Sequence, residues 1–155
     1  MAALAARCEG AARWQASSLD QAIRAGALAW IAEYDEDLVG LILVRIAADE
    51  MEILNLAVAP EQRRNGVGTR LLMQAIRHAT RIGAKKAYLE VRSANDGGRE
   101  FYVAHHFRVC GCRENYYTAP VDDALLLSRE LKAFDGGLRR ETPVTPTSKI
   151  HRAKS

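Results

Sequence analysis

The fold is decided by the stretch Asn55-Leu-Ala-Val-Ala-Pro60-Glu-Gln-Arg63-Arg64-Asn65-Gly66-Val67-Gly68 and the run that follows it. A β-rich segment over residues 51–59 ends at Pro60, because proline has no N–H to give to a sheet. From position 69 on, apolar side chains recur three or four residues apart, which predicts an amphipathic helix that ends at Gly83. The sequence therefore places a glycine-containing loop between a strand and the start of a helix.

This loop has the composition of an anion site. Glycines at positions 66 and 68 let the backbone approach a ligand closely and adopt positive φ. The helix that follows supplies unpaired N–H groups and the positive end of its dipole, an arrangement that suits a pyrophosphate, and Arg63 and Arg64 add positive charge at the rim. Two glycines also fit a plain turn. The loop has neither the third glycine of the Rossmann fingerprint nor the Gly-Lys-Ser/Thr of a P-loop.

The flanking segments predict a mixed sheet. Alternating apolar residues and intervening turns indicate strands over residues 28–34, 38–47, 51–59, 86–92, 107–117 and 124–131. Helices are predicted over about 18–25, from 69 to the glycine at 83, and from the end of a loop over 93–98 to about 104. Short turns would pair the second and third strands antiparallel. The order β-β-β-α-β-α-β-β predicts one α/β domain of the α+β type, with a mixed, mostly antiparallel twisted sheet flanked by helices.

The composition is that of an ordinary globular protein. Of the 155 residues, 48% are hydrophobic and 26% are charged, which argues against global disorder and against a membrane protein. The longest apolar run, residues 39–44, is far shorter than the roughly 20 residues that cross a bilayer, and Arg7 and Glu9 interrupt the place of a signal peptide. We therefore expect a cytoplasmic protein. The cysteines at positions 8, 110 and 112 fit neither a disulfide framework nor a zinc site, so no metal is expected.

The positive charge is concentrated at the C-terminal end. Residues 135–155 carry five basic and two acidic residues, which accounts for the whole net charge of +3. This segment has no apolar cluster, which predicts a disordered basic tail after a domain covering residues 1–134. A neutral domain with a small basic tail does not look like a nucleic-acid binder, and no direct contact with nucleic acid is expected. The tail is either a solvated end or a weak, salt-sensitive attraction to an anionic partner such as a ribosome.

The combined string resembles the GNAT family of acetyltransferases. The acetyl-CoA loop of that family follows the pattern Arg/Gln-x-x-Gly-x-Gly/Ala, and Arg63 to Gly68 matches it. The resemblance extends over residues 39–131. Its later part is similar to the RimI-like branch, which acetylates the N-terminal alanine of a small-subunit ribosomal protein. The residues that carry this similarity are Leu89-Glu90-Val91-Arg92, Asn95, Tyr102, Asn115-Tyr116-Tyr117 and Asp123-Ala-Leu-Leu.

The resemblance implies an N-acetyltransferase that uses acetyl-CoA as donor and a protein N-terminus, such as that of a ribosomal protein, as acceptor. Glu90 stands where RimI-like enzymes keep their general base, and Tyr102 where they keep their general acid. Tyr116 or Tyr117 would line the acceptor groove. The counterparts of cofactor-binding residues are Leu56, Ala57 and Val58 along the pantetheine arm, Arg63, Arg64, Asn65, Gly66, Val67, Gly68 and Thr69 at the pyrophosphate, and Asn95.

Elementary chemistry agrees with an α-amine acceptor. The attacking amine must be neutral, and an α-amine with a pKa of about 7.7–8.0 is neutral far more often at pH 7 than a lysine with a pKa of about 10.4. A partly buried Glu90 would then suffice as base, directly or through a water. Taken alone, the strand pattern also fits an exposed Glu90 paired with an arginine, and Tyr102 also fits a core aromatic. Acetylation of a small-molecule amine or a lysine, or acyl-CoA binding without catalysis, remain alternatives.

Several local features shape these expectations. Tyr116 and Tyr117 are neighbours on a strand, so their side chains should face opposite sides, one in the core and one at the groove. His105-His106-Phe107 replaces the usual Leu-Gly-Phe of the family, so His106 is expected to take the left-handed backbone of the missing glycine. Asp96-Gly97-Gly98 replaces an alanine-rich helix start, and the region before the second strand is short for the family.

Either a monomer or a homodimer fits a chain of this length.

Overall fold

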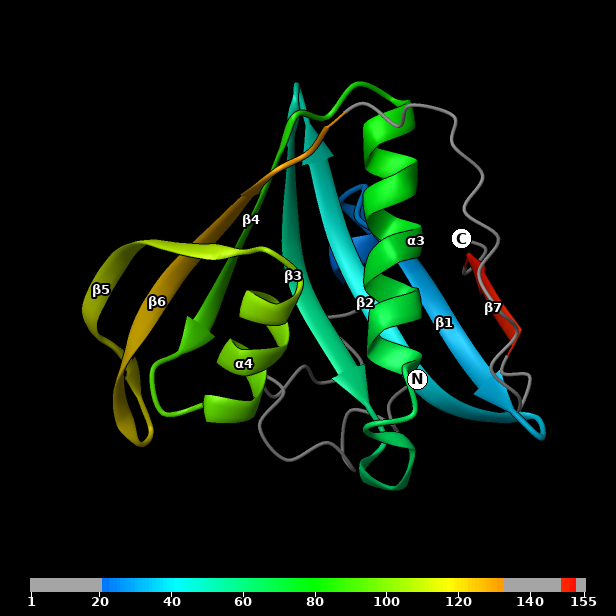
Figure 1. The fold of residues 1–155 in the computed structure, drawn as a ribbon, viewed down its shortest axis with the longest axis horizontal. Helices are drawn as coiled ribbons and strands as arrows, with labels where there is room; N and C mark the ends of the chain where they lie inside the picture. Colours follow the sequence, from blue (N-terminus) through cyan, green and yellow to red (C-terminus); the bar gives the residue numbers. More distant parts are fainter. Residues whose placement is uncertain (1–20, 133–148, 153–155) are drawn as a thin grey trace.

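The protein is a seven-stranded sheet with helices packed on it (Figure 1). A computed structural model describes residues 21–132 and 149–152. The elements along the chain are β1 (Leu28–Tyr34), β2 (Asp37–Ala47), β3 (Glu50–Val58), η1 (Pro60–Gln62), α3 (Val67–Arg81), β4 (Lys86–Arg92), α4 (Asp96–Ala104), β5 (Arg108–Thr118), β6 (Val121–Glu130) and β7 (Lys149–Arg152). In space the strands follow the order β5-β6-β4-β3-β2-β1-β7. Among these strands only β3 and β4 pair in parallel, so the predicted mixed, mostly antiparallel sheet is confirmed.

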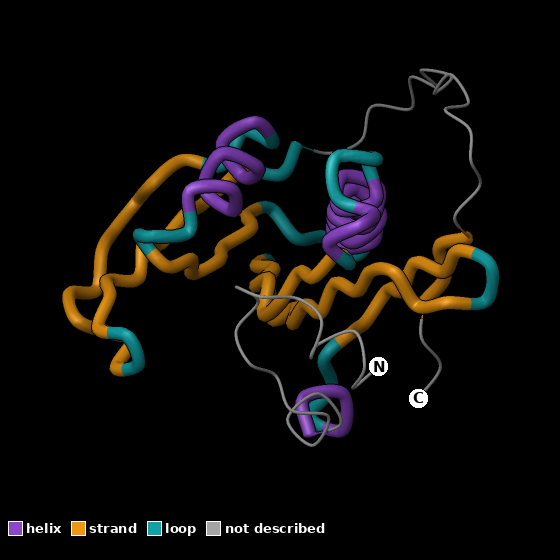
Figure 2. The backbone as a smooth tube through the Cα atoms, turned by 90° about the horizontal axis from the view of Figure 1, so that it is seen from below, coloured by secondary structure: helices purple, strands orange, loops and turns teal. Residues whose placement is uncertain are grey.

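The helices lie on both faces of the sheet. Figure 2 shows α3 and α4 on one face and the helical turn at residues 21–24 on the other. One side of α3 is buried, and its members are Val67, Leu71, Leu72, Ala75, Ile76 and Ala79. Gly40 on β2 permits this packing, because a Cβ at that position would lie 2.9 Å from the side chains of both Leu71 and Val67. The predicted apolar face of α3 therefore packs against β1, β2 and β3.

Strand bounds match the prediction closely, and helix starts do not. β1 and β4 have the predicted bounds. Gly66, at a φ of 74°, is the N-cap of α3, so this helix begins two residues before the predicted start. The Asn95 side chain caps α4 by accepting a hydrogen bond from Gly98 N at 2.9 Å, so α4 already begins within the segment predicted as loop. A cap is a local hydrogen bond, and the hydrophobic period does not reveal it.

The predicted disordered tail is wrong for part of its length. Residues 149–152 form β7, which pairs antiparallel with the outer edge of β1, from Trp30 opposite Arg152 to Glu33 opposite Lys149. An exposed edge of β1 would leave a row of backbone N–H and C=O groups without protein partners, and β7 supplies them. The rest of the predicted tail lies outside the described residues, as do residues 18–20 at the start of the predicted first helix.

The sheet divides in its middle. The parallel ladder between β3 and β4 is short, running only from Glu50 opposite Lys86 to Ile53 opposite Leu89. At the same level the β2–β3 register shifts, because Leu43 pairs with Asn55 and Val44 with Ile53, which leaves Leu54 as an extra residue in β3. Beyond this bulge β3 stays paired with β2 while β4 stays paired with β6, and the two strands diverge (Figure 1).

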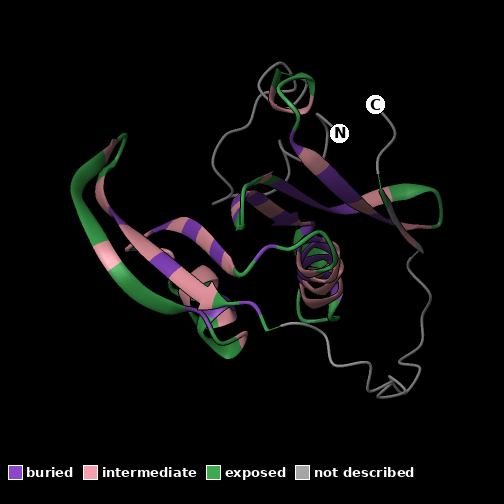
Figure 3. Ribbon diagram, turned by 90° about the horizontal axis from the view of Figure 1, so that it is seen from above, coloured by how far each residue is buried: buried purple, intermediate pink, exposed green. Residues whose placement is uncertain are grey.

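The outermost strand on the β4 side of the sheet is exposed. No residue of β5 is buried, and Figure 3 shows the strand as an almost continuous exposed band. Its register against β6 shifts twice, between Val109 and Gly111 and between Arg113 and Tyr117. Cys110 and Cys112 are both exposed thiols on this strand.

Candidate active site

A cleft of about 740 Å³ opens where β3 and β4 diverge. One wall is β3 and the loop after it, the other is β4 with α4, and the start of α3 closes one end. The residues that line it are Ile53, Leu54, Asn55, Leu56, Ala57, Val58, Gln62, Arg63, Arg64, Gly66, Val67, Gly68, Thr69, Leu89, Glu90, Val91, Arg92, Asn95, Gly97, Gly98, Glu100, Phe101, Tyr102, Ala104 and Tyr117. The cleft thus collects most of the predicted site residues from segments far apart in the chain.

The end of the cleft at α3 has the features of an anion site. Arg64 and Gly66 have positive φ values of 65° and 74°, which turns the chain sharply before the helix. The first helical hydrogen bond runs from Arg70 N to Gly66 O at 3.0 Å, so the N–H groups of Val67 and Gly68 precede it. No side chain caps this helix. The orphan N–H groups and the helix dipole therefore favour an anion here.

Gly68 is needed for close packing as well as for the loop. A Cβ on Gly68 would lie 3.3 Å and 3.4 Å from two atoms of the Phe101 ring. The start of α3 and the middle of α4 therefore touch across the end of the cleft. This contact connects the loop to the helix that carries Tyr102.

Two predicted cofactor residues use their side chains within the loop. Arg63 Nε donates to Val58 O at 3.3 Å, so this side chain spans from the loop to the end of β3. Asn65 Nδ2 donates to Gln62 Oε1 at 3.4 Å, and Asn65 does not line the cleft. Asn65 is therefore the one predicted cofactor residue that the structure leaves outside this wall.

The wall formed by β3 presents backbone to the cleft. Pairing with β4 stops at Ile53, so Leu54 to Ala57 face the opening along an edge that β4 does not cover. A strand edge of this kind can bond an extended ligand through main-chain groups. Leu56 and Ala57, the predicted counterparts of pantetheine-binding residues, lie on this open edge and line the cleft.

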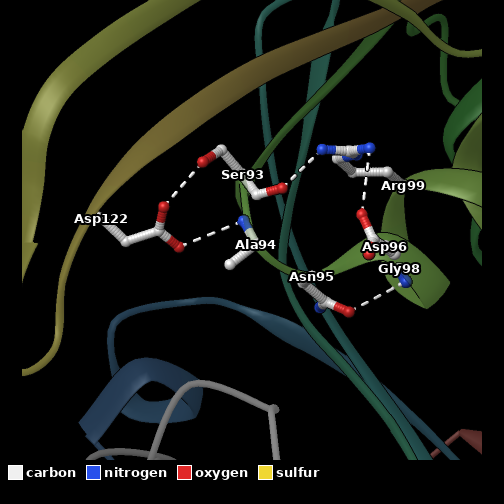
Figure 4. Close-up of polar contacts among 7 residues, drawn as sticks. All are labelled: Ser93, Ala94, Asn95, Asp96, Gly98, Arg99 and Asp122. Carbon is white, nitrogen blue, oxygen red and sulfur yellow. Dashed lines mark hydrogen bonds and ion pairs between the residues drawn. The ribbon is translucent and has the colours of Figure 1, made fainter.

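The loop between β4 and α4 is held by a polar network (Figure 4). Asp122 on β6 accepts from Ser93 Oγ at 2.6 Å and from Ala94 N at 3.2 Å. The Ser93 hydrogen bond is the main reason that the pKa of Asp122 lies below its ordinary value. Arg99 on α4 donates to Ser93 O at 2.5 Å, which ties the helix to the same loop. Sequence analysis missed Asp122, whose only signal was its place beside the Asp123-Ala-Leu-Leu string.

Asn95 lies in this network and in the cleft. Its Oδ1 is committed to the cap of α4, while the residue also lines the cleft. A cap fixes the side-chain orientation, so the Asn95 amide is held at a defined place on the wall.

Glu90 is both a residue of the cleft and a member of an ion pair, the two interpretations that the sequence left open. It lines the cleft, and its carboxylate also pairs with Arg113 on β5 at 3.3 Å. Its side chain is 29% exposed, so the pair is only partly shielded from water. Arg113 was not predicted as a site residue, because nothing local in the sequence places it opposite Glu90.

Tyr102 is both packed and directed to the cleft. It is 8% exposed, and its ring meets Phe101 and Phe107 edge-on at centroid distances of 5.2 Å and 5.5 Å. Burial raises the pKa of its phenol well above the ordinary value. No described residue makes a hydrogen bond to its hydroxyl, which is therefore available as a donor to a group bound in the cleft.

The expected arrangement of Tyr116 and Tyr117 is wrong. The two rings do not face opposite sides but contact each other, with centroids 5.2 Å apart and planes at 84°. The cause is the irregular segment before them: Asn115 has a φ of 51° and donates from N to Asp123 Oδ1 at 2.8 Å. A bulge breaks the alternation of side chains along a strand.

Neither tyrosine is part of the core. Tyr117 lines the cleft, with the Arg92 guanidinium 3.9 Å from its ring centroid. Burial, followed by the charge of Glu90, raises the pKa of Tyr117. Tyr116 is 48% exposed and lies outside the cleft lining. The structure thus supports Tyr117, and not Tyr116, as a residue of the groove.

His106 adopts the predicted backbone. Its φ is 64°, the left-handed conformation that glycine would take at this turn. The chain therefore reverses after α4 without the usual glycine, and Phe107 is 1% exposed beyond the turn.

Comparison with known proteins identifies the family. The model of the acetyltransferase (GNAT) family matches residues 4–107. The chain belongs to the GNAT family. It is 31% identical over 88 residues to the ribosomal protein bS18-alanine N-acetyltransferase of Escherichia coli K12, covering 56% of this chain and 60% of that protein. It is 32% identical over 97 residues to a Bacillus subtilis protein provisionally assigned the same activity, of which it spans 64%.

Solved GNAT structures have the same fold. The crystal structure of the ribosomal-protein-S18-alanine N-acetyltransferase from Escherichia coli superposes with a TM-score of 0.73 at 24% identity, covering 88% of this chain and 89% of that chain. A GNAT family acetyltransferase from Elizabethkingia anophelis with acetyl-CoA bound superposes with a TM-score of 0.67 at 23% identity, covering 76% and 84% of the two chains. The predicted fold class and family are therefore confirmed.

Two further searches of the described residues concern other classes of site. None of the described helices is both long and apolar enough to span a membrane. Within the same residues, no three His, Cys, Asp or Glu side chains are grouped where they would hold a metal ion.

Proposed function

We propose that this protein transfers the acetyl group of acetyl-CoA to the α-amine of a protein N-terminus, with a ribosomal-protein alanine as the model acceptor. The observation that carries the proposal is the shared cleft, whose lining joins the open start of α3 to Glu90 and Tyr102. The family match supports acetyl transfer, and the names of the relatives support the acceptor. Because the alignments span less than two thirds of those relatives, the activity and acceptor are proposed for this chain and not transferred from them.

The donor would lie along the β3 wall. Its diphosphate would accept hydrogen bonds from the N–H groups at the start of α3, beside Arg64. The pantetheine arm would then follow the open edge at Leu56 and Ala57 toward the middle of the cleft. This direction brings the thioester between Glu90 and Tyr102, which line the opposite wall.

Glu90 would take the proton of the attacking amine. The amine nitrogen forms a bond to the thioester carbon, and the carbon–sulfur bond breaks as the intermediate collapses. Glu90 receives the amine proton, directly or through one water. The pair with Arg113 orients the carboxylate from the β5 side, so the base is held at the wall by a residue from another strand.

Tyr102 would donate a hydrogen bond to the leaving sulfur. Its raised pKa keeps the hydroxyl protonated at neutral pH, so it remains a hydrogen-bond donor throughout the reaction. The same shift makes it a weaker acid than an exposed tyrosine. Its principal contribution would therefore be a hydrogen bond to the departing thiolate, which would take its proton from solvent while Tyr102 keeps its own.

The acceptor would enter from the side of β4 and β5. Tyr117 lines the cleft there, and Arg92 holds it by stacking on its ring while bonding Pro120 O at 3.2 Å. An extended N-terminal segment would pass this tyrosine to reach Glu90. Tyr116 would contribute only to the outer rim.

A mass-spectrometric transfer assay tests the proposed function. Purified protein and acetyl-CoA are incubated with a peptide that begins with free alanine, and in parallel with the same peptide carrying a blocked N-terminus and an added lysine. We expect acetylation of the first peptide only, and loss of this transfer in Glu90→Gln. Transfer to the lysine peptide would reassign the acceptor, and acyl-CoA binding without transfer to any amine would reduce the protein to a binding module.

A further inference from the structure

His105 connects the cofactor loop to the helix that carries Tyr102. Its Nδ1 lies 2.7 Å from Phe101 O, and its Nε2 lies 3.1 Å from Thr69 Oγ1. Its ring also packs on the Phe101 ring, with centroids 4.4 Å apart. Thr69 lies in the first turn of α3 and lines the cleft, 36 positions away in the sequence. A half-buried imidazole therefore bridges two elements that meet at the proposed diphosphate site.

The hydrogen-bond partners fix which ring atoms carry protons. A carbonyl oxygen only accepts, so the nitrogen facing Phe101 O must carry a hydrogen. In a neutral ring the other nitrogen has none, and it must accept the single hydroxyl hydrogen of Thr69. The Thr69 hydroxyl is then committed to the ring and cannot donate to an anion in the cleft.

A second proton on the ring reverses this bond. With both nitrogens protonated, Nε2 donates to Thr69 Oγ1, and the hydroxyl hydrogen is released. Thr69 can then donate to a phosphate oxygen while remaining bonded to His105. The imidazolium also brings one positive charge close to the bound anion, which stabilises the anion further.

Charged and titratable groups reach this region from several elements. The same end of the cleft is lined by Arg63, Arg64, Glu100 and Tyr102, while Arg70 follows Thr69 on α3, Arg99 lies on α4 and His106 follows His105 in the chain. Arg129 of β6 is anchored on His105, since its Nη1 donates to His105 O at 3.0 Å. A diphosphate bound at the start of α3 would add negative charge, which favours a protonated imidazole beside it.

We propose that His105 is a positioning residue that couples binding of the acyl-CoA diphosphate to the uptake of one proton from solvent, through Thr69. This inference rests on the proposed function, because it needs the diphosphate at the start of α3. Since the ligand binds the protonated form better, affinity rises as pH falls through the neutral range, by at most tenfold per pH unit for one coupled proton.

Calorimetry with 3′-dephospho-CoA tests the coupling. This probe keeps the diphosphate but lacks the 3′-phosphate, whose own titration would add protons near neutral pH. Binding to the full chain is measured between pH 6 and 8.5, and at pH 7 in two buffers of different ionisation enthalpy. We expect net proton uptake by the wild-type protein and a dissociation constant that rises with pH.

Three variants separate coupling from structure. His105→Gln keeps a polar side chain without a titrating ring, and Thr69→Val removes the hydroxyl but keeps the shape. Both are expected to bind with little proton uptake and a flat pH dependence. His106→Asn is the matched control, since asparagine tolerates left-handed backbone, and it should keep the wild-type dependence.

The possible outcomes distinguish failure of the proton coupling from failure of the proposed function on which it rests. Tight binding without proton uptake in the wild-type protein, or equal uptake in wild type, His105→Gln and Thr69→Val, would overturn the coupling and leave the proposed function intact. Failure of both CoA and its dephospho form to bind wild type would overturn the proposed function and the coupling with it. Should His105→Gln not fold, wild type and Thr69→Val still decide the question.

Discussion

The two halves of the sheet that flank the cleft are built in different ways. The donor side, which consists of β1, β2, β3 and α3, is closely packed: residues 39–44 of β2 are all buried, and α3 covers one face of this strand. The hairpin, which consists of β5 and β6, has no buried residue in β5 and only two in β6 (Figure 3). The donor side is thus held by its apolar core, whereas the hairpin holds Glu90 and Tyr117 through an ion pair, ring contacts and a bulge.

This difference matches the two tasks of an acyltransferase. Every reaction of such an enzyme uses the same donor, so a rigid wall of fixed shape serves it. Acceptors differ more, and an exposed hairpin can change its side chains without disturbing the core. The predictions that follow test whether binding of the donor, catalysis and recognition of the acceptor separate along this division.

The largest effect is expected at the boundary between the two sides. Glu90→Gln removes the base but preserves the size of the side chain, so kcat should fall by about 10²–10⁴-fold. CoA affinity should stay near the wild-type value, because Glu90 does not belong to the donor side. Steady-state rates and calorimetry measure the two quantities, with Glu114→Gln on the exposed strand as control. Equal losses in both variants would remove Glu90 from the chemistry.

Stability should depend strongly on the donor side and weakly on the hairpin. Leu72 on α3 is fully buried, and Leu72→Ala should lower the free energy of unfolding by about 2–5 kcal/mol. Val109 on β5 is 58% exposed, and Val109→Ala should change it by less than about 0.5 kcal/mol. Urea unfolding of both variants checks the contrast. Similar losses in the free energy of unfolding would mean that the hairpin contributes more to stability than its exposure indicates.

Two glycine-to-alanine substitutions, one at the end of the cleft and one away from it, test how CoA binding depends on the donor side. Gly68→Ala would push on the Phe101 ring, and a cost at the low end of overpacking, about 1 kcal/mol, would weaken CoA binding several-fold. Gly111 on β5 lies outside the cleft lining, and a Cβ there would make an ordinary contact of 3.6 Å with Leu126, so Gly111→Ala should leave CoA binding unchanged. Calorimetric titration of both with CoA is the measurement. Equal affinities would show that the contact between Gly68 and Phe101 does not position the loop.

The smallest effect concerns the buried phenol. Because burial raises the pKa of Tyr102, the unfolded chain loses this proton first as pH rises through about 10. The stabilising contribution is therefore complete below that pH and declines above it, by less than about 1 kcal/mol up to pH about 10.5. Urea unfolding at pH 8 and 10.5 should show a smaller decline in Tyr102→Phe than in wild type. Tyr116→Phe, at an exposed ring, should keep the wild-type decline; an identical slope in all three proteins would argue against burial of this hydroxyl.

The sequence predicted the donor side well because its signals are local. The period of apolar residues predicted α3, the alternation in residues 86–92 predicted β4 and its faces, and the glycines at positions 66 and 68 predicted the loop that leads into α3. Even the turn at His106 followed from the tolerance of one residue type for positive φ. These features depend on neighbours in the chain, which a sequence displays directly.

The hairpin and the edges were harder because their structure depends on distant residues. The backbone N–H of Asn115 donates to the Asp123 carboxylate, and β5 bulges at this point. The Tyr116 and Tyr117 rings therefore contact each other, whereas regular alternation of side chains would have placed them on opposite faces. Arg113 on β5 reaches Glu90 on β4 across the one intervening strand, β6, and β7 pairs with β1 although the two strands lie near opposite ends of the described chain. Pairings of this kind are set by register and tertiary packing, which no local pattern specifies.

The separation of the two sides is tested most directly by comparing the Michaelis constants of two variants for both substrates. Gly68→Ala on the donor side and Tyr117→Ala on the hairpin are assayed with acetyl-CoA and with the alanine peptide. We predict crossed effects: Gly68→Ala raises the KM for acetyl-CoA several-fold and leaves that for the peptide, while Tyr117→Ala does the reverse. A joint rise of both constants in either variant, or a rise for acetyl-CoA in Tyr117→Ala, would contradict a cleft with separate donor and acceptor walls.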